Sequence, residues 1–253
     1  MNNGSKPVYK EPVGETPCRS GCPVHIDIPR QNRFISQGKF SDAVAVIREK
    51  NPLPAICGRV CFHPCEDKCL LAELDKPVAI KLLKRFAIEH DDKNLWKQNS
   101  KIAPATGKRV AVIGSGPSSL TAAYYLAKQG HSVTIFEALP QPGGMMRVGI
   151  PEYRLPRETL DSEIKEIKAV GVEIKTNTRV ESLDKLLDQG FNAIFLGLGA
   201  HQGIKMGVEG EDGPGVIECI TFLRKVNSGE KVRLGNKAAI IGGGNAAIDA
   251  ART

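Results

Sequence analysis

The sequence is poor in aromatic residues and contains no long apolar run. Aromatic side chains make up 5% of the 253 residues, too few for the interleaved basic and aromatic surface of a nucleic-acid-binding protein, although the formal net charge is +7. No apolar run approaches the ~18 residues that a membrane-spanning helix needs, and the polar residues 1–17 lack the hydrophobic region of a signal peptide. We therefore expect a cytoplasmic protein with no membrane span and no nucleic-acid partner.

The sequence also lacks the patterns of acid–base and nucleophilic catalysis. Its five histidines are scattered, and neither a His-Glu-x-x-His motif nor a Ser/His/Asp arrangement is evident. Any redox or group-transfer chemistry would therefore come from bound cofactors, which the protein positions.

The cysteines, by contrast, are concentrated in one region. Six of the seven lie between residues 18 and 69, and Cys219 stands apart. Cys18-x3-Cys22-Pro23 matches the end of the bacterial ferredoxin run C-x2-C-x2-C-x3-C-P, but no cysteine precedes Cys18. In the absence of a secretion signal, such clustering favours metal ligation over a disulfide framework. The clustered thiols therefore predict a metal centre.

A polar linker, residues 91–107, separates two kinds of pattern. Before it, apolar periodicity predicts one helix that has Ser41 as its N-cap and ends at Asn51-Pro52, and a second helix over residues 77–90. The apolar stripe of the second helix comprises Val78, Leu82, Leu83 and Phe86. After the linker the sequence alternates strands, glycine turns and helices, with further strands expected within residues 171–180 and 191–200.

The first glycine turn follows the expected strand Val110–Ile113 and reads Gly114-Ser115-Gly116-Pro117-Ser118-Ser119. The first glycine permits a tight turn, and the second lets the backbone approach a pyrophosphate at the N-terminus of the next helix. Ser119 stands where glycine or alanine is usual. Glu137 lies about 20 residues further on, where a carboxylate holds ribose hydroxyls. The turn therefore predicts dinucleotide binding.

The second glycine turn, Gly242-Gly243-Gly244-Asn245-Ala246-Ala247, follows the expected strand Ala238–Ile241. Two such turns in one chain indicate a flavin and a nicotinamide nucleotide, with the second turn in a domain inserted into the flavin domain. We expect an α/β protein with a helical iron–sulfur domain and linker (1–105), a Rossmann-like FAD domain (106–236) and the start of an NAD(P) domain (237–253). Because a βαβ unit needs its return strand, the last domain is expected to be truncated.

The motifs, taken in order, resemble the small (β) subunit of NADPH-dependent glutamate synthase. They are Gly-x-Gly-Pro-x-x-Leu at the first turn, FEALPQPGGMMRVGIPEYRLP at 136–156, and GGGNAAIDAAR at 242–252. The same module resembles the N-terminal half of dihydropyrimidine dehydrogenase and the large subunit of NADH-dependent ferredoxin:NADP oxidoreductase. The resemblance implies an oxidoreductase that passes electrons between NAD(P)H, FAD and a [4Fe-4S] centre, to or from a partner subunit or ferredoxin. The basic excess of residues 1–105 is either a solvated surface or a docking face for such a partner.

The resemblance also implies the residues at each nucleotide. Those expected at FAD are Ser115 to Ser119, Glu137, Gly143, Gly144, Met145, Arg154 and Val180. Those expected at NADP or NAD are Gly242, Gly244, Asn245 and Ala246. The alternative for Arg154 is an exposed loop arginine, and the preference between NAD and NADP stays open.

The iron–sulfur ligands carry over less completely. Two-cluster relatives have a C-x-x-C before the position of Cys18, and this chain has none. The resemblance groups Cys22, Cys61 and Cys65 at one cluster, and Cys18 with Cys69 at another. In the relatives, the fourth ligand of the first of these clusters is not a cysteine, and this chain has Leu83-Lys84-Arg85 in that region. Cys57 matches a cysteine that is not a ligand in the relatives. We expect one [4Fe-4S] cluster held by Cys22, Cys61 and Cys65, with the fourth ligand open among Cys18, Cys57 and Cys69; two clusters remain an alternative.

Two other functions stay open on the sequence alone. C-x3-C spacing also suits zinc, which would make residues 18–69 a stapled interaction module fused to nucleotide-binding domains. A thioredoxin-reductase-like enzyme would need a redox-active C-x-x-C in its nicotinamide domain, and Cys219 has no such neighbour in the sequence.

Overall fold

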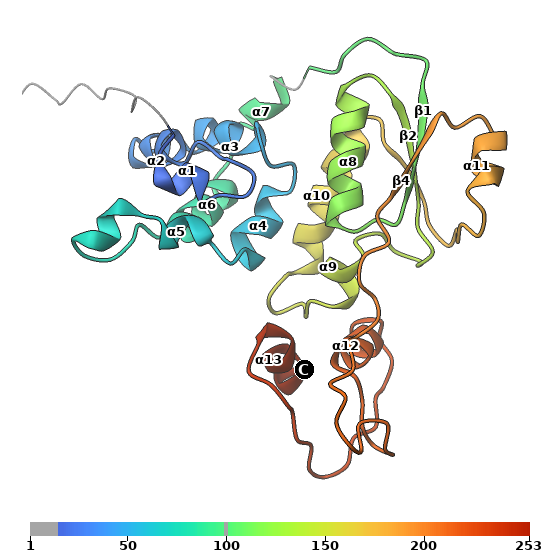
Figure 1. Cartoon of the computed structure of the whole chain (residues 1–253). Coiled ribbons are helices and arrows are strands. Elements are labelled where there is room, and N and C mark those ends of the chain that lie inside the picture. Colours follow the sequence, from blue (N-terminus) through green and yellow to red (C-terminus); the bar gives the residue numbers. More distant parts are fainter. Residues whose placement is uncertain (1–14, 99–100) are drawn as a thin grey trace, which may run out of the picture. The chain divides into compact units, whose positions relative to one another are not determined.

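The computed structural model describes residues 15–98 and 101–253, which divide into two compact units (Figure 1). Among these residues, unit 1 holds 15–54 and 61–98, and unit 2 holds 55–60 and 101–253. The predicted domain limits after residues 105 and 236 remain predictions. No helix of the described residues is both long enough and apolar enough to cross a bilayer.

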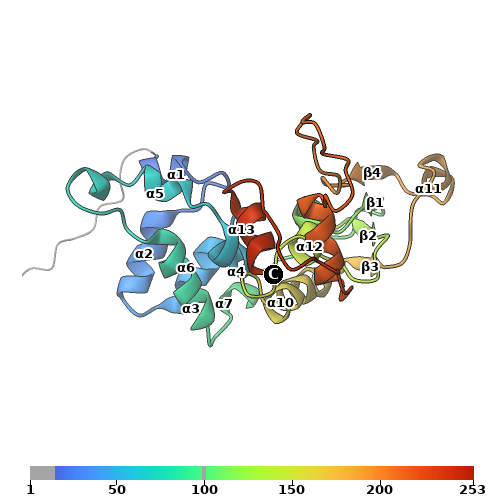
Figure 2. The same cartoon turned by 90° about the horizontal axis from the view of Figure 1, so that it is seen from below.

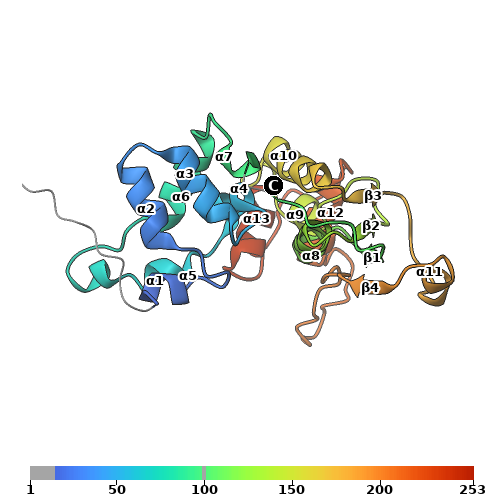
Figure 3. The same ribbon diagram turned by 90° about the horizontal axis from the view of Figure 1, so that it is seen from above.

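Unit 1 is built from short helices, and α2, α3 and α6 pack side by side in its centre (Figures 1 and 3). The elements are α1 (Pro17–Ser20), α2 (Ile28–Ser36), α3 (Phe40–Arg48), α5 (Pro64–Asp67), the 3-10 helix η1 (Leu70–Glu73), α6 (Ile80–Glu89) and α7 (Leu95–Gln98). One apolar core contains the thiols of Cys22 and Cys65 beside Ile26, Ile28, Ile47 and Ile80. The cysteines thus lie in the packed interior of the unit.

Both helices predicted before the linker are present, but two of their details are wrong. Ser41 is not the N-cap of α3; it lies inside the first turn, buried, and its hydroxyl donates to Asp91 Oδ1 at 2.6 Å. In α6, Leu82 is 62% exposed and Phe86 is 45% exposed, whereas Ile80, Lys84 and Ala87 are buried. Packing against α2 and α3 selects the buried face, and apolar content alone does not reveal that choice.

The expected linker contains a helix as well. Within residues 91–107, α7 places Trp96 in a second core with Ala43, Val44 and Ala87. The Arg48 guanidinium lies 3.9 Å from the Trp96 ring centroid, within the range of a cation–π contact. This part of the linker is therefore packed onto unit 1.

Unit 2 contains a four-stranded parallel sheet in the order β3-β2-β1-β4, which Figure 2 shows from below. The strands are β1 (Arg109–Ile113), β2 (Ser132–Phe136), β3 (Glu173–Lys175) and β4 (Ala193–Leu196). Val112 of β1 pairs with Ile135 of β2 and Phe195 of β4. Residues 110–113 are all buried, as expected for a central strand covered on both faces.

Helices cover the sheet on two sides. The helices of unit 2 are α4 (Pro54–Val60), α8 (Pro117–Lys128), α9 (Met145–Val148), α10 (Arg157–Ala169), α11 (Asp184–Asp188), α12 (Cys219–Asn227) and α13 (Asn245–Arg252); only Pro54 of α4 groups with unit 1. In Figure 3, α8 and α10 lie on one side of the strands and α11 on the other. Leu186 of α11 packs against Ala111, Ile113 and Phe136. The mixed α/β fold with a parallel sheet is confirmed.

One predicted strand is absent. Residues 238–241 are not in a strand, and Ile241 is 77% exposed. A strand exists only where a neighbour pairs with its N–H and C=O groups, and within residues 101–253 no strand pairs with this segment. The helix after the second glycine turn, α13, is present nevertheless.

Candidate functional site

The first glycine turn joins β1 to α8 at the carboxyl edge of the sheet. Gly114 has φ +88°, and a Cβ there would lie 2.5 Å from the carbonyl oxygen of Gly197, which follows β4. A Cβ on Gly197 would in turn lie 1.9 Å from Ser119 Oγ. The sequence did not single out Gly197, which lies within the segment 191–200 expected to contain a strand and directly after β4 in the structure. Close approach of the Gly197 backbone therefore requires glycine at position 114, whereas the Ser119 hydroxyl occupies the space that a side chain at position 197 would need.

The space in front of this turn suits a pyrophosphate. A Cβ added to Gly116 would meet no atom within 4 Å, and Gly116 is the N-cap of α8, with Pro117 at the first helical position. The first N–H groups of a 12-residue helix thus face an open position, where the helix dipole favours an anion. Pro117 and Ser118 are exposed at this end, whereas Ser119 is buried, and its hydroxyl donates to the Gly197 carbonyl at 3.4 Å.

Glu137 lies beside the first turn, as expected from its position at the end of β2. Its carboxylate is buried and accepts hydrogen bonds from the Ser115 N–H at 2.9 Å, the Ser115 hydroxyl at 2.5 Å and the Leu139 N–H at 2.8 Å. A carboxylate offers about four acceptor positions, so one remains for a ribose hydroxyl. Glu137 therefore shapes the turn as well as facing the expected nucleotide.

The Gly143-Gly144 loop closes over the same turn. The Gly143 N–H donates to Ser115 Oγ at 2.9 Å, and a Cβ on Gly144 would lie 2.8 Å from the Gly116 Cα. Met145 follows as the first residue of α9 and is partly buried. The hydroxyl of Ser115 thereby connects Glu137 and the loop in one hydrogen-bonded network.

Val180 and Arg154, the other residues expected at FAD, lie in different surroundings. Val180 is partly buried against the core of Ala111, Phe136 and Phe191. Arg154 pairs with Asp249, whose carboxylate oxygen lies 2.5 Å from its guanidinium. The sequence analysis missed Asp249, and its contact with Arg154 is a finding of the structure alone.

The second glycine turn is exposed. Gly242 has φ +113°, and a Cβ on Gly243 or Gly244 would meet nothing within 4 Å. Gly244 is the N-cap of α13, and Asn245 and Ala246 form its first turn; the Ala246 carbonyl accepts from the Cys219 thiol at 3.2 Å. Backbone N–H groups are thus open to solvent at a helix N-terminus, the arrangement that binds a pyrophosphate.

In unit 1 the structure brings Cys22, Cys61 and Cys65 near one another. Burial raises the pKa of the Cys65 thiol to about 11; the Lys84 ammonium opposes the rise, and the Cys22 and Cys61 thiols add to it. Thiolates rather than thiols ligate iron, so loading a cluster here would release protons. Among the described residues, no three His, Cys, Asp or Glu side chains are gathered as tightly as a single metal ion requires.

Cys18 and Cys69 lie at one pocket, and Cys18 also packs against the core that contains Cys22 and Cys65. The pocket is largely apolar, has a volume of 260 Å³ and is also lined by Leu70, Val78 and Ile80. The Val78 N–H points at the Cys69 sulfur at 3.4 Å, and the His63 N–H points at the Cys61 sulfur at 3.3 Å. N–H donors aimed at cysteine sulfurs are typical of iron–sulfur surroundings, where they tune the reduction potential. Cys57 lies on α4, in unit 2.

Comparison with protein families supports both parts of the site. A model of the family "dihydropyrimidine dehydrogenase domain II, 4Fe-4S cluster" matches residues 13–96, and a model of the NAD(P)-binding Rossmann-like domain matches residues 112–161. The second match includes the first glycine turn, Glu137 and Arg154. The helical region that holds six cysteines thus belongs to a described iron–sulfur domain.

Individual proteins match almost the whole chain. The NADP(+)-dependent formate dehydrogenase subunit beta of Moorella thermoacetica is 43% identical over 97% of this chain and 38% of its own length. The NADPH-Fe(3+) oxidoreductase subunit beta of Geobacter sulfurreducens is 44% identical over 93% of this chain and 36% of its own. The glutamate synthase [NADPH] small chain of Escherichia coli is 32% identical over 95% of this chain and 54% of its own. The chain therefore spans about a third to a half of these relatives.

Among solved structures, a 2-naphthoyl-CoA reductase complex with 2-naphthoyl-CoA is similar to this chain, with a TM-score of 0.52 and 25% identity. The similarity covers 91% of this chain and 31% of that protein. The match includes both units' sequence ranges and agrees with the mixed α/β architecture.

Proposed function

Because this chain is a member of the family that includes the glutamate synthase small chain, we propose that it is the electron-transfer module of an NAD(P)H-dependent oxidoreductase. Electrons would pass between a nicotinamide nucleotide at the second glycine turn, FAD at the first turn, and a [4Fe-4S] centre in unit 1. FAD, when bound, supplies the step from two-electron to one-electron chemistry. The observation that carries the proposal is that one chain contains both a matched 4Fe-4S domain and a preformed dinucleotide turn.

The assignment of FAD to the first turn rests on that turn's preformed geometry. Ser115, Glu137 and the Gly143-Gly144 loop are hydrogen-bonded into one cradle in front of Gly116. Flavin and nicotinamide dinucleotides share the pyrophosphate and ribose that such a cradle binds, and the matched family is named for NAD(P). The second glycine turn provides the place for the nicotinamide nucleotide, which leaves the first turn to FAD.

In this scheme Cys22, Cys61 and Cys65 hold the cluster, and the fourth ligand is open among Cys18, Cys57 and Cys69. The side chains of Cys22 and Cys65 are buried in an apolar core, which would shield a cluster from solvent. The shared pocket of Cys18 and Cys69 supports the alternative of a second cluster nearby. The final electron acceptor or donor is a partner subunit or a ferredoxin, since the formate dehydrogenase and NADPH-Fe(3+) oxidoreductase relatives are named as subunits. We place this protein in the cytoplasm, because its cysteines must stay reduced to ligate iron and its proposed substrate is a nicotinamide nucleotide.

Metal and flavin content of anaerobically purified protein tests this proposal. We expect iron and acid-labile sulfide, a flavin spectrum with a broad iron–sulfur shoulder, and bleaching of both on addition of NADPH or NADH. A colourless protein that contains zinc would support the stapled interaction module instead, and an absence of flavin would overturn the proposal.

Cysteine variants sharpen the same experiment. Cys22→Ala removes a buried ligand, so iron content should fall to background while flavin content stays near that of the parent protein. Cys219→Ala is the matched control, because Cys219 lies in unit 2 and its thiol donates to the Ala246 carbonyl at 3.2 Å. Equal iron in the two variants would contradict the ligand assignment.

A further inference from the structure

The helix that follows the second glycine turn is attached to unit 2 by a carboxylate. Asp249 is 4% exposed, and it is the one buried residue of α13. The apolar Ile248 beside it is 50% exposed. A short surface helix normally packs onto its domain through an apolar face. In the eight-residue α13, the buried side chain is instead that of Asp249.

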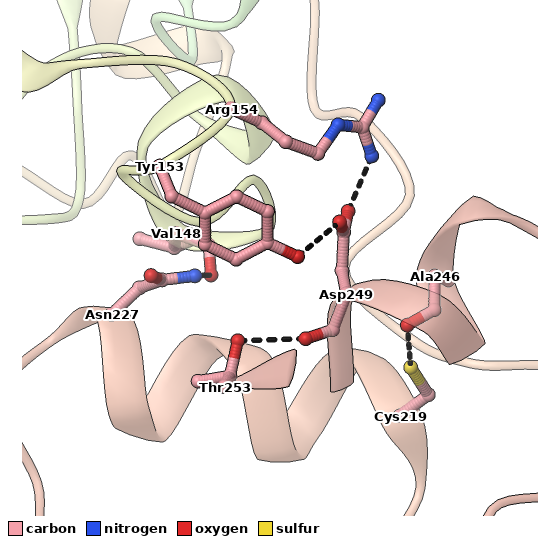
Figure 4. Close-up of polar contacts among 8 residues, drawn as sticks. All are labelled: Val148, Tyr153, Arg154, Cys219, Asn227, Ala246, Asp249 and Thr253. Carbon is pink, nitrogen blue, oxygen red and sulfur yellow. Dashed lines mark hydrogen bonds and ion pairs between the residues drawn. The ribbon is translucent and has the colours of Figure 1, made fainter. Parts of the chain in front are cut away.

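Two side chains of the loop after α9 hold this carboxylate (Figure 4). The Tyr153 hydroxyl donates to Asp249 Oδ1 at 2.9 Å, and the Arg154 guanidinium donates to Asp249 Oδ2 at 2.5 Å. In addition, the Arg252 guanidinium lies 4.3 Å from the centroid of the Tyr153 ring. Loop 149–156 and α13 are therefore joined by three contacts that converge on neighbouring residues.

The loop is itself connected to the first cofactor site. It follows Gly143, Gly144 and the short helix α9, which form one wall of the first turn's cradle. Asn227 of α12 adds a second tie, because its side-chain amide donates to the Val148 carbonyl at 3.0 Å and α12 packs on α13. A continuous path of contacts thus leads from the first turn to the helix of the second.

A buried ion pair contributes little net free energy to the attachment of a helix. Desolvating an ion pair costs about as much as the attraction returns, so an apolar pair of similar volume would hold a helix as firmly. Hydrogen bonds of fixed direction, however, define one orientation of the two segments, which apolar packing does less well. The direction of α13 decides where the N–H groups of Gly244, Asn245 and Ala246 point.

We propose that Asp249 is a positioning residue for the nicotinamide-nucleotide turn. By holding Tyr153 and Arg154, it fixes the helix whose N-terminus receives the nucleotide pyrophosphate, and it couples that turn to the loop of the flavin site. The inference rests on the proposed function, because it assigns the second turn to NAD(P) and the first to FAD.

Affinity for NADP+ or NAD+, measured by calorimetry on the whole FAD-loaded protein, tests the role of Asp249. Asp249→Asn should weaken binding of the preferred nucleotide about tenfold, with FAD content and melting temperature close to those of the parent. Tyr153→Phe removes only one hydrogen bond and should weaken binding about threefold. Glu152→Gln removes an exposed carboxylate from the same loop and should leave the affinity unchanged.

A double variant separates positioning from general weakening. If Tyr153 acts through Asp249, Tyr153→Phe combined with Asp249→Asn should bind the nucleotide no more weakly than Asp249→Asn alone. The inference would be overturned if the affinity losses of the two single variants multiplied in the double variant. Unchanged nucleotide affinity in a folded Asp249→Asn variant would overturn it as well. If Asp249→Asn does not fold, unchanged affinity in Tyr153→Phe has the same consequence. A parent protein that binds neither FAD nor a nicotinamide nucleotide would instead refute the proposed function.

Discussion

At the scale of single residues, glycines at the first turn are set by contacts between segments distant in the sequence. Gly144 has φ +52°, and a Cβ there would approach the Gly116 backbone to 2.8 Å. Gly171 has φ +97° with nothing within 4 Å of an added Cβ. Both positions have a positive φ, which favours glycine, and only Gly144 has backbone atoms close to an added Cβ.

Alanine substitutions at these two positions should therefore differ. Gly171→Ala is expected to cost about 1–2 kcal/mol of unfolding free energy, from the backbone conformation alone. Gly144→Ala should cost a further ~1–3 kcal/mol, because the methyl group displaces the turn, and FAD content should fall with it. Urea unfolding and the flavin-to-protein ratio measure both effects. Equal losses of stability, with flavin retained in both variants, would show that the close approach is unimportant.

Residue patterns located the two glycine turns but not their supporting contacts. Gly114, Gly116 and Glu137 follow from a motif of fixed spacing, and the structure brings them together at one edge of the sheet. Gly197 and Asp249 belong to no such local motif. Their importance comes from backbone approach and from an ion pair across 95 residues, which depend on how the chain folds back.

At the scale of elements, helix ends show how tertiary contacts alter a local preference. Ser41 has the chemistry of an N-cap, but its hydroxyl is used by Asp91, 50 residues away. A side-chain N-cap does operate at α12, where the Glu218 carboxylate accepts from the Ile220 and Thr221 N–H groups, both at 2.7 Å. Partial burial by itself would raise the pKa of Glu218, but these hydrogen bonds outweigh it and hold that pKa below its ordinary 4.5.

Glu218→Ala should lower the unfolding free energy by about 1 kcal/mol at neutral pH, the usual value of an N-cap. Since the folded-state pKa is the lower one, this stabilisation is present above pH 4.5 and is lost as the pH falls through the folded-state value. The difference between parent and variant should accordingly shrink in acid. Glu209→Gln, at an exposed carboxylate, serves as the control in the same urea titrations. A difference that persists or grows in acid would exclude the carboxylate cap.

Strands depend on neighbours even more than helices do. The apolar residues 238–241 suit a strand, yet they remain unpaired in the described part of unit 2. The helix α13 forms directly after them, because its backbone hydrogen bonds are satisfied within the segment itself. Local sequence is therefore a better guide to helices than to strands.

At the scale of the whole molecule, the two compact units should respond differently to loss of the metal. Cys22 and Cys65 are part of the apolar core of unit 1, and the two glycine turns lie in unit 2. A bound cluster crosslinks segments that are otherwise held by short helices, and metal binding energy adds directly to folding energy in small domains.

Removal of iron by a chelator and oxidant should therefore raise amide hydrogen exchange in residues 15–54 and 61–98, chiefly in α1, α5 and η1. Exchange in the strands of unit 2 and the flavin content should change little. Hydrogen-exchange mass spectrometry before and after iron removal measures this, with the Cys22→Ala protein as a reference for the cluster-free state. Uniform exchange changes across both units would show that the cluster stabilises the molecule as one body.

The sequence by itself determined the class of protein and the order of its parts. Clustered cysteines, glycine turns of fixed spacing and apolar runs are local signals, and they sufficed for the α/β fold, the helical iron–sulfur region and the first nucleotide turn. Only the tertiary structure decided which face of α6 is buried, that Gly197 supports the first turn, and that Asp249 holds Arg154. Each of these features depends on contacts between segments far apart in the chain. The residue pattern of either segment alone does not reveal such contacts.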